Sequence, residues 1–288
     1  MTITLLDGGM GQELMKRSGD TPTPLWSTQV MLDHPGLVAE VHSDYFNAGA
    51  EVATANSYAI LRNRLAFNDL EDRFADFLNA AMDEAHAARD AHGSGQVAAS
   101  LGPLKASYRP DLFPPHQEAV AEYSELVEIL APRADFLVAE TVASLDHARA
   151  VLEAAQDHPI WLAITVDDED GTKFRSGDQV ADLTPIFAER APDAVLVNCS
   201  APEAITQTMP ILATFGLPYG AYANGFIEIT KAFLGAKPTV DALKAREDIT
   251  PERYADFAAE WIDMGATIIG GCCEVGPAHI AELKRRFG

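Results

Sequence analysis

Eight short apolar runs recur along the chain, and segments with helical spacing lie between most of them. Parallel strands need long crossover connections, usually helices, so this alternation predicts a parallel sheet. For 288 residues, of which 48% are hydrophobic, a closed (β/α)₈ barrel (a TIM barrel) is the simplest arrangement. A doubly wound open sheet is the alternative. The expected strands are Ile3–Leu6, Glu51–Ala55, Gln96–Ala99, Asp135–Ala139, Ile160–Val166, Ala194–Asn198, Tyr219–Ala223 and Thr267–Gly270.

The segments between these runs place apolar residues three and four positions apart, the spacing of one helical face. Pro35–Asn47 and Asp69–His92 show this spacing, and further helices are expected near 116–132, 144–157, 178–190, 202–214, 251–264 and 277–286. No tandem repeat, low-complexity tract or obvious linker interrupts the pattern. We therefore expect residues 1–288 to form a single domain. One long excursion, 224–248, follows the seventh strand and could cover one end of the barrel.

The chain is strongly acidic, with a net charge of −22 from 21 Lys and Arg against 43 Asp and Glu. This charge opposes phosphate backbones and anionic membrane surfaces, so no nucleic-acid or membrane partner is expected. No run of about 18 apolar residues predicts a transmembrane helix. The amino terminus lacks the basic and long apolar segments of a signal peptide, so we expect a cytoplasmic protein.

Glycines and polar residues gather directly after the expected strands. "DGGMG" follows the first, "NSY" the second, "ET" the fourth, "NCS" the sixth, "NG" the seventh and "GGCC" the eighth. In a barrel these carboxyl ends form one rim, and barrel enzymes build their sites there. The sequence therefore predicts one site assembled from many loops.

The three cysteines, Cys199 and the adjacent Cys272 and Cys273, all fall on this rim. A reducing compartment argues against a disulfide framework. Structural zinc sites usually have four protein ligands, whereas three ligands plus one exchangeable position is the pattern of a catalytic zinc. The alternative is that the cysteines are buried small hydrophobes, which is most plausible for Cys199 taken alone.

Two adjacent cysteines bind one ion only if the backbone turns sharply between them. We expect Gly270 and Gly271 to supply the conformational freedom and the space for close approach. His279, inside the last expected helix, is interpreted as a packing or surface residue. Metal coordination deprotonates a thiol outright, whereas a free thiol with a pKa of about 8.5 stays mostly protonated at neutral pH. The chemistry predicted from such a site is alkyl transfer to a substrate sulfur.

The stretches "LLDGGMGQEL", "VNCS" and "IIGGCCEVGPAHI", in this order, resemble the homocysteine S-methyltransferase family. Supporting stretches such as "PLWST" and "VHSDYFNAGAEVATANSYA" extend the resemblance over nearly the whole chain. The resemblance implies that Cys199, Cys272 and Cys273 bind Zn²⁺. It also implies methyl transfer to the thiolate of L-homocysteine, which gives methionine.

The resemblance assigns further residues to substrate binding. Asp7 and Gly8 match positions that contact homocysteine, and Glu140 matches a carboxylate that holds its amino group. Both carboxylates have an alternative role as helix caps or partners of loop amides. Asn224 matches an asparagine that approaches zinc when homocysteine is absent, although the usual preceding proline is Ala223 here.

The methyl donor is expected to be a sulfonium or quaternary ammonium compound, which would suit aromatic walls and nearby carboxylates. Tyr58 and Trp26 are the first candidates for such walls, followed by Phe113, Tyr222 and Phe226. S-methylmethionine is the first choice of donor, ahead of betaine, dimethylsulfoniopropionate and S-adenosylmethionine. The chain has no room for the folate and corrinoid domains of the large methionine synthase, so a separate corrinoid protein is the alternative methyl source.

Three other interpretations remain open from the residues alone. The first is a barrel lyase or hydrolase with a zinc-activated water. The second is a non-enzymatic zinc- or thiol-binding protein, and the third makes the cysteines purely structural.

Overall fold

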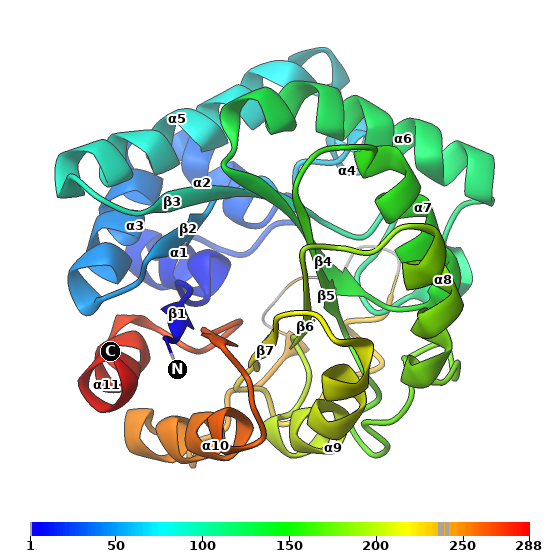
Figure 1. Ribbon diagram of the computed structural model, residues 1–288. Coiled ribbons are helices and arrows are strands. Elements are labelled where there is room, and N and C mark those ends of the chain that lie inside the picture. The colour runs from blue at the N-terminus through cyan, green and yellow to red at the C-terminus, as the bar shows by residue number, and fades with distance from the viewer. Residues whose placement is uncertain (1, 236–238, 240–241) are drawn as a thin grey trace.

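The computed structural model describes residues 2–235, 239 and 242–288. Its eight parallel strands pair in the order β1-β8-β7-β6-β5-β4-β3-β2, and a bridge from Leu6 to Val52 joins the two ends of this sheet. The strands therefore form a nearly closed ring, which confirms the predicted TIM barrel (Figure 1). They are β1 Thr4–Leu5, β2 Val52–Thr54, β3 Gln96–Leu101, β4 Phe136–Val142, β5 Ile160–Ile164, β6 Ala194–Asn198, β7 Tyr219–Tyr222 and β8 Ile268–Ile269.

The helices surround the barrel as an outer layer (Figure 1). They are α1 Met10–Ser18, α2 Ser27–Asp33, α3 Leu37–Ala48, α4 Arg62–Ala66, α5 Phe74–His92, α6 His116–Leu130, α7 Leu145–Ala155, α8 Leu183–Glu189, α9 Pro202–Leu212, α10 Pro251–Asp263 and α11 Pro277–Phe287. None of these helices is long and apolar enough to cross a bilayer, in the part of the chain that the structure describes.

The expected helices agree with the structure except where an element is short. The helix predicted at 178–190 is a 3₁₀ turn, Val180–Asp182, followed by the seven-residue α8. The helices α2 and α4 were not predicted, because seven and five residues are too few to display a helical period. Both lie close to the rim.

The strands are buried on both faces, as expected for a parallel sheet covered by helices. Along β6, for example, Val195 and Val197 join the large core cluster shared with the helices, whereas Ala194 and Leu196 join a second cluster. Leu6, Val52, Ala98, Val138, Ala163 and Ile268, from strands around the ring, belong to that second cluster. This packing fills the barrel interior below the rim.

One buried tyrosine ties the outer layer to the rim. Tyr254 of α10 is fully buried; its hydroxyl donates to the carbonyl of Gly270 at 2.6 Å and accepts from the amide of Ala223 at 2.9 Å. Gly270 follows β8 and Ala223 follows β7, so one side chain fixes the spacing of two strand ends. The segment after β8 carries two of the three cysteines.

Replacing Tyr254 by Phe should lower the free energy of unfolding by about 1–3 kcal/mol, because it leaves a buried amide and a buried carbonyl without this partner. The matched control is Tyr219→Phe, whose hydroxyl donates to the carbonyl of Met264 at an exposed position. Urea denaturation of both variants, with unchanged dependence on denaturant, measures the difference. Equal losses for the two variants would contradict the role given to Tyr254.

Candidate metal centre and substrate pocket

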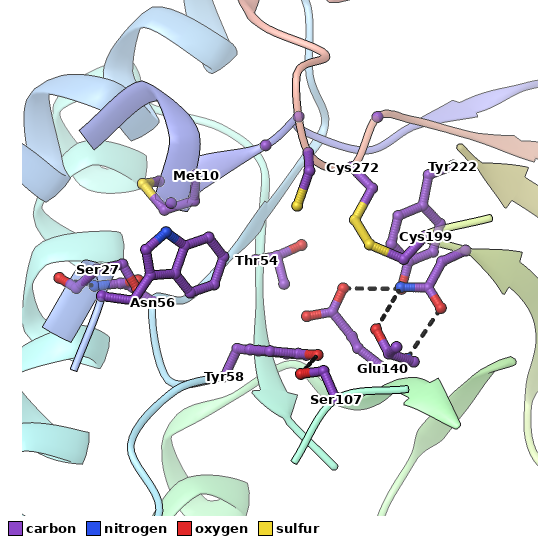
Figure 2. Close-up of a pocket in the computed structure, with 18 of the residues that line it drawn as sticks. Met10, Ser27, Thr54, Asn56, Tyr58, Ser107, Glu140, Cys199, Tyr222 and Cys272 are labelled. Carbon is purple, nitrogen blue, oxygen red and sulfur yellow. Dashed lines mark hydrogen bonds between the residues drawn. A yellow bond between two sulfur atoms is a disulfide. The ribbon is translucent and has the colours of Figure 1, made fainter. Parts of the chain in front are cut away.

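A pocket opens at the carboxyl ends of the strands, where the sequence predicted the site (Figure 2). Its walls come from the loops after β1, β2, β3, β6, β7 and β8 and from Glu140 and Thr141 of β4 itself. Most of the predicted site residues line it, among them Asp7, Gly8, Trp26, Tyr58, Glu140, Cys199, Cys272 and Cys273, whereas Asn224 and Phe113 do not.

The three cysteine sulfurs form a cluster in this pocket, with all three Sγ atoms within 4.8 Å of one another. Cys199 and Cys272 are joined as a disulfide, with their Cα atoms 5.7 Å apart, and Cys273 is free (Figure 2). The expectation of no disulfide was therefore wrong for this structure. It rested on the cellular compartment, whereas the fold itself places the two thiols at bonding distance.

The reduced cluster fits a tetrahedral metal ion. Zinc–sulfur bonds of about 2.3 Å place neighbouring sulfurs about 3.8 Å apart, which agrees with three Sγ atoms inside 4.8 Å. Burial, with smaller contributions from Glu274 and Glu140, raises the pKa of the Cys273 thiol to about 12. This thiol would lose its proton at neutral pH only to a bound cation.

The cysteine loop is anchored to the segment after β7. Cys272 donates its amide to the carbonyl of Ala223 at 2.9 Å, and the carbonyl of Cys273 accepts from the amide of Gly225 at 2.9 Å. A turn then closes from the amide of Val275 to the carbonyl of Cys272 at 3.0 Å. These bonds hold the adjacent cysteines in one orientation without help from a metal.

The two glycines before the cysteines serve close packing, and the prediction of special backbone freedom there was wrong. Neither adopts a left-handed backbone; that conformation occurs at Glu274, where φ is 65°. A Cβ on Gly270 would lie 2.5 Å from Cβ of Leu6, and one on Gly271 would lie 2.2 Å from the Val275 side chain. The loop therefore packs against its neighbours too closely for any side chain at these positions.

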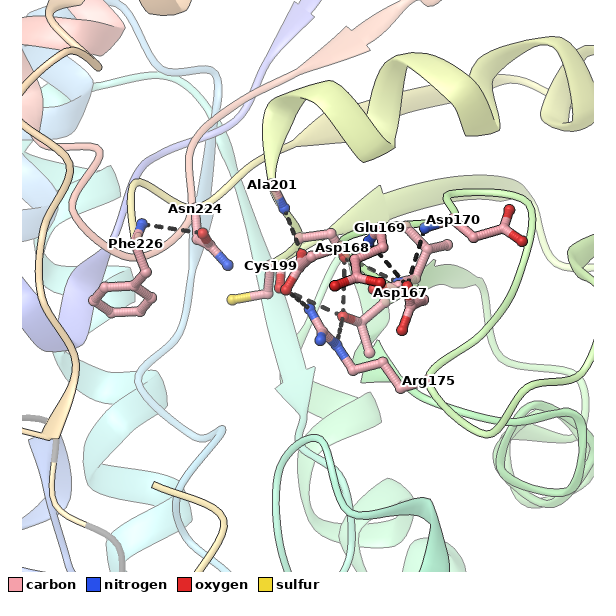
Figure 3. Close-up of polar contacts among 12 residues, drawn as sticks. Asp167, Asp168, Glu169, Asp170, Arg175, Cys199, Ala201, Asn224 and Phe226 are labelled. Atoms are coloured by element: carbon pink, nitrogen blue, oxygen red, sulfur yellow. Dashed lines mark hydrogen bonds and ion pairs between the residues drawn. The ribbon is translucent and has the colours of Figure 1, made fainter. Parts of the chain in front are cut away.

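Cys199 has a left-handed backbone with φ of 49°, an unusual conformation for a residue with a side chain. The following residue, Ser200, accepts from the amide of Val166 at 2.9 Å through its Oγ. Asp168 accepts from the amide of Ala201 at 2.9 Å and from Arg175 at 2.9 Å (Figure 3). The loop after β5 therefore fixes the strained turn that carries Cys199.

Asp168 and Arg175 were not predicted as parts of the site. Their signal in the sequence is weak, because "DDEDGTKFRSGD" reads as an ordinary charged surface loop. Only the structure places Asp168 against the amide two residues beyond Cys199. Arg175 also stacks over the ring of Tyr108, a pocket residue, at 4.8 Å.

Asp7 is a buried carboxyl group held by one neighbour. Its two oxygens accept from the amide of Thr54 at 2.7 Å and from the Thr54 hydroxyl at 2.8 Å. Burial raises the pKa of Asp7 to about 8, although the Thr54 bonds oppose the shift. His42 lies 3.8 Å away, but burial lowers its pKa to about 3, so it stays neutral and provides no counter-charge.

Glu140 lies where β4 is irregular, since the pairing with β5 shifts register between Ala139 and Val142. It accepts a hydrogen bond from the Tyr222 hydroxyl at 2.9 Å (Figure 2) and another from the Ser100 hydroxyl. Burial raises the pKa of this carboxyl group, which has no Lys or Arg partner among the described residues. A cation entering the pocket would find two carboxyl groups without counter-charge.

Asn198, the last residue of β6, links Glu140 to the cysteine cluster. Its side-chain oxygen accepts from the amide of Thr141 at 3.0 Å, and its side-chain amide donates to the Thr141 hydroxyl at 3.3 Å. Thr141 follows Glu140 and has a left-handed backbone with φ of 57°, while Cys199 follows Asn198. The "VNCS" stretch thus positions the carboxylate as well as the thiol.

Trp26 and Tyr58 face each other across one wall of the pocket, with ring centroids 6.3 Å apart in an edge-to-face arrangement. The Tyr58 hydroxyl lies 2.7 Å from the Ser107 hydroxyl. The indole nitrogen of Trp26 is buried without a hydrogen-bond partner among the described residues. This wall offers aromatic surface to a ligand.

Tyr222 and Phe226 also line the pocket, as predicted, but Phe113 does not. Phe113, in the loop after β3, stacks on His147 at 4.8 Å and packs against the core, so its assignment to the aromatic wall was wrong. Two aromatic residues were missed, Tyr108 and Phe233, whose rings are 6.0 Å apart. Phe233 belongs to the excursion after β7, where aromatic residues carry no periodic signal.

The excursion 224–248 contributes to the pocket wall through Phe226, Phe233, Thr239 and Leu243. It turns back on itself, because Phe226 forms an antiparallel bridge with Ala245. Its residues 236–238, 240 and 241 lie outside the described part of the chain. The described part supports the expectation of a cover at this end of the barrel.

Asn224 lies beside Cys199 but does not line the pocket (Figure 3). It is buried, and its side-chain oxygen accepts from the amide of Phe226 at 3.1 Å. Its approach to a metal stays a prediction. His279 accepts from the amide of Gly276 at 3.2 Å and contacts the carbonyl of Ile249 at 3.0 Å, which confirms a packing role.

The family model, the related sequences and the related structures all point to one family. The family model described as homocysteine S-methyltransferase matches residues 4–287. The homocysteine S-methyltransferase of Escherichia coli is 30% identical over 99% of this chain and 95% of its own length; Bacillus subtilis YbgG, of the same name, is 28% identical over 98% and 93%. The metallated crystal form of E. coli homocysteine methyltransferase MmuM superposes with a TM-score of 0.83, at 28% identity, over 99% of this chain and 96% of that one.

The raised pKa of Asp7 predicts a pH effect on the reduced, metal-free protein. Folded Asp7 holds its proton more tightly than unfolded Asp7, whose pKa is 3.8. The stabilisation from this proton is complete below about pH 3.8 and is lost as pH rises to about 8. The stability of the wild type relative to Asp7→Asn should therefore fall between about pH 5 and pH 8. Urea denaturation across this range measures the trend, with exposed Asp157→Asn as control. A difference independent of pH would contradict it.

Proposed function

Because the chain belongs to the homocysteine S-methyltransferase family, we propose that it transfers a methyl group from a small onium donor to L-homocysteine, giving methionine. S-methylmethionine is the first choice of donor. The observation that carries the proposal is the cluster of three cysteine sulfurs in a pocket with two carboxyl groups that lack counter-charge. The chain is an enzyme by family membership, so the non-enzymatic interpretation is set aside.

The residues proposed to hold Zn²⁺ are Cys199, Cys272 and Cys273. When bound, zinc would keep the homocysteine sulfur deprotonated and nucleophilic at neutral pH. The spacing of the sulfurs supports this assignment, as does the existence of a metallated form of the E. coli relative. The disulfide between Cys199 and Cys272 must first be reduced, and a cytoplasmic location would favour the thiol state.

The amino end of homocysteine is proposed to bind between the two carboxyl groups. Glu140 would accept from the ammonium group while Ser100 and Tyr222 fix its two oxygens. Asp7, held by Thr54, would add a second negative group once the ammonium lowers its pKa. At Gly8 a Cβ would lie 2.2 Å from the carbonyl of Val275, so the wall beside Asp7 carries no side chain.

The transfer itself needs alignment more than proton transfer. The bond from the methyl carbon to the donor sulfur breaks, its electron pair stays on that sulfur, and a new bond forms to the homocysteine sulfur. The thiol proton of homocysteine leaves to solvent, and with S-methylmethionine both products are methionine. The chain's contribution is to hold the two sulfurs in line with the methyl group and to exclude water with walls such as Trp26 and Phe226.

The described geometry favours a small donor over a separate corrinoid protein. The excursion lines the pocket with Phe226, Phe233 and Leu243, so these side chains would contact a small donor directly. A hydrolase with a zinc-activated water is less well supported. Among the described residues that line the pocket there is no histidine to act as a general base.

The test is methionine formation from homocysteine by reduced, zinc-loaded protein, with the four onium donors in parallel. Cys272→Ala should reduce turnover below detection and lower the bound zinc, because it removes one of three proposed ligands. A thermal unfolding curve on the reduced variant controls for folding. Absence of methionine with every donor, from wild-type protein that retains zinc, would overturn the direct small-donor mechanism.

Replacing Glu140 by Gln keeps the size of the side chain, but it removes the charge and replaces one of the two accepting oxygens by a donating NH2 group. Losing a charged hydrogen bond costs about 1.5–3 kcal/mol, which corresponds to roughly a ten- to hundredfold rise in KM for homocysteine. Steady-state kinetics should show a much smaller change in the KM of the donor. An unchanged KM for homocysteine would argue against contact between Glu140 and its amino group.

A further inference from the structure

Arg64 is a cationic side chain in the pocket wall that no described residue neutralises. It belongs to the short helix α4 and lines the pocket together with Trp26 and Tyr58. Among the described residues, no carboxylate lies within 4.0 Å of its guanidinium and no group accepts a hydrogen bond from it. Arg64 is half-buried, and a charge that is partly removed from water without a partner is unfavourable in the free protein, so an anionic ligand would relieve this cost.

The neighbouring arginine on the same helix shows the contrast. Arg62 is exposed, forms a two-pronged ion pair with Glu125 at 2.5 and 2.7 Å, and stacks on the ring of Phe74 at 4.6 Å. Two positions apart on a helix, the side chains point in different directions. One arginine therefore stabilises the surface, while Arg64 contributes its guanidinium to the pocket.

The charges of the pocket are separated along its length. Asn198, which precedes Cys199, accepts a hydrogen bond from Thr141, which follows Glu140, and the Asp7 carbonyl accepts from the amide of Gly271, next to Cys272, at 2.9 Å. Both carboxyl groups are therefore held beside the cysteines, and we call this the acidic end of the pocket. Arg64 forms the basic end, at the wall of Trp26 and Tyr58, and Tyr58 is the titratable group that acts on it among the described residues.

We propose that Arg64 binds the carboxylate of a zwitterionic methyl donor, so that the enzyme selects onium carboxylates over simple onium cations. The inference rests on the proposed methyl transfer. The onium group of the donor must lie at the cysteine end, where homocysteine presents its sulfur. Its carboxylate then extends past the Trp26–Tyr58 wall to the guanidinium, which can bind both oxygens at once.

This assignment names a donor class by its chemistry. S-methylmethionine, betaine and dimethylsulfoniopropionate each carry an onium centre and a carboxylate on one short chain. The acidic end would favour the first charge and Arg64 the second, so the pocket is complementary to the whole zwitterion. A donor amide of the same shape would leave the guanidinium unpaired.

The test compares S-methyl-L-methionine with S-methyl-L-methioninamide at saturating homocysteine, in wild type, Arg64→Gln and Arg64→Lys. The wild type should prefer the carboxylate donor. Arg64→Gln should raise its KM roughly ten- to hundredfold, leave the KM of the amide nearly unchanged and abolish the preference. Arg64→Lys should recover part of the preference for the carboxylate donor, because it restores the positive charge. Arg62→Gln, on the same helix but outside the pocket, is the control and should retain the wild-type preference.

Two results would overturn the inference about Arg64 while methyl transfer stands. One is an unchanged donor KM in Arg64→Gln; the other is a rise in the KM for homocysteine instead. If the wild type makes no methionine, the proposed function fails separately, and calorimetric binding of S-methyl-L-methionine to wild type and Arg64→Gln tests Arg64 directly. Equal affinity of the two proteins would then reject the assignment.

Discussion

The parallel pairing of neighbouring strands, which closes into a ring where Leu6 meets Val52, is the constraint on which the rest of this structure depends. Cys199 follows β6 and the adjacent cysteines follow β8, and both strands pair with β7, so the three sulfurs meet on one rim within 4.8 Å. The strand between them, β7, supplies Ala223 and Gly225, which hydrogen-bond to the backbone of the cysteine pair. The cluster is therefore set by backbone packing on three adjacent strand ends, and this explains why glycines and a strained turn surround it.

Burial then decides the protonation of the groups above this cluster. Asp7 is buried and Glu140 is half-buried, neither has a cationic partner among the described residues, and the pKa of both is raised. With its pKa at about 8, Asp7 is mostly protonated in the free pocket at neutral pH. A bound ammonium group would reverse this shift. The same argument applies with opposite sign to Arg64, whose pKa is lowered by burial. The pocket thus holds separated, incompletely compensated charges that a zwitterionic ligand would satisfy.

The errors of the sequence analysis have physical causes. Gly270 and Gly271 were expected to supply both backbone freedom and space for close approach, and only the close approach is found. A glycine in a sequence does not show which of the two is needed. Phe113 fell in a loop that resembles the rim, yet it packs on His147 because an aromatic side chain near a rim can turn toward the core. Asp168 was missed because it supports the turn of Cys199 by accepting a hydrogen bond from the amide of Ala201, a contact between two loops that no sequence pattern marks.

The sequence by itself determined the barrel and the identity of the thiol cluster. Strand and helix periodicities are local, and parallel strands separated by helices have few ways to pack at this length. The position of "VNCS" and "GGCC" at strand ends then placed three cysteines on one rim. Only the tertiary structure decided that Asp7 and Glu140 lack counter-charge, that Asn198 links Glu140 to Cys199, and that Arg64 rather than Arg62 reaches the pocket. These features depend on which loops meet and how side chains are enclosed, and a sequence pattern carries neither kind of information.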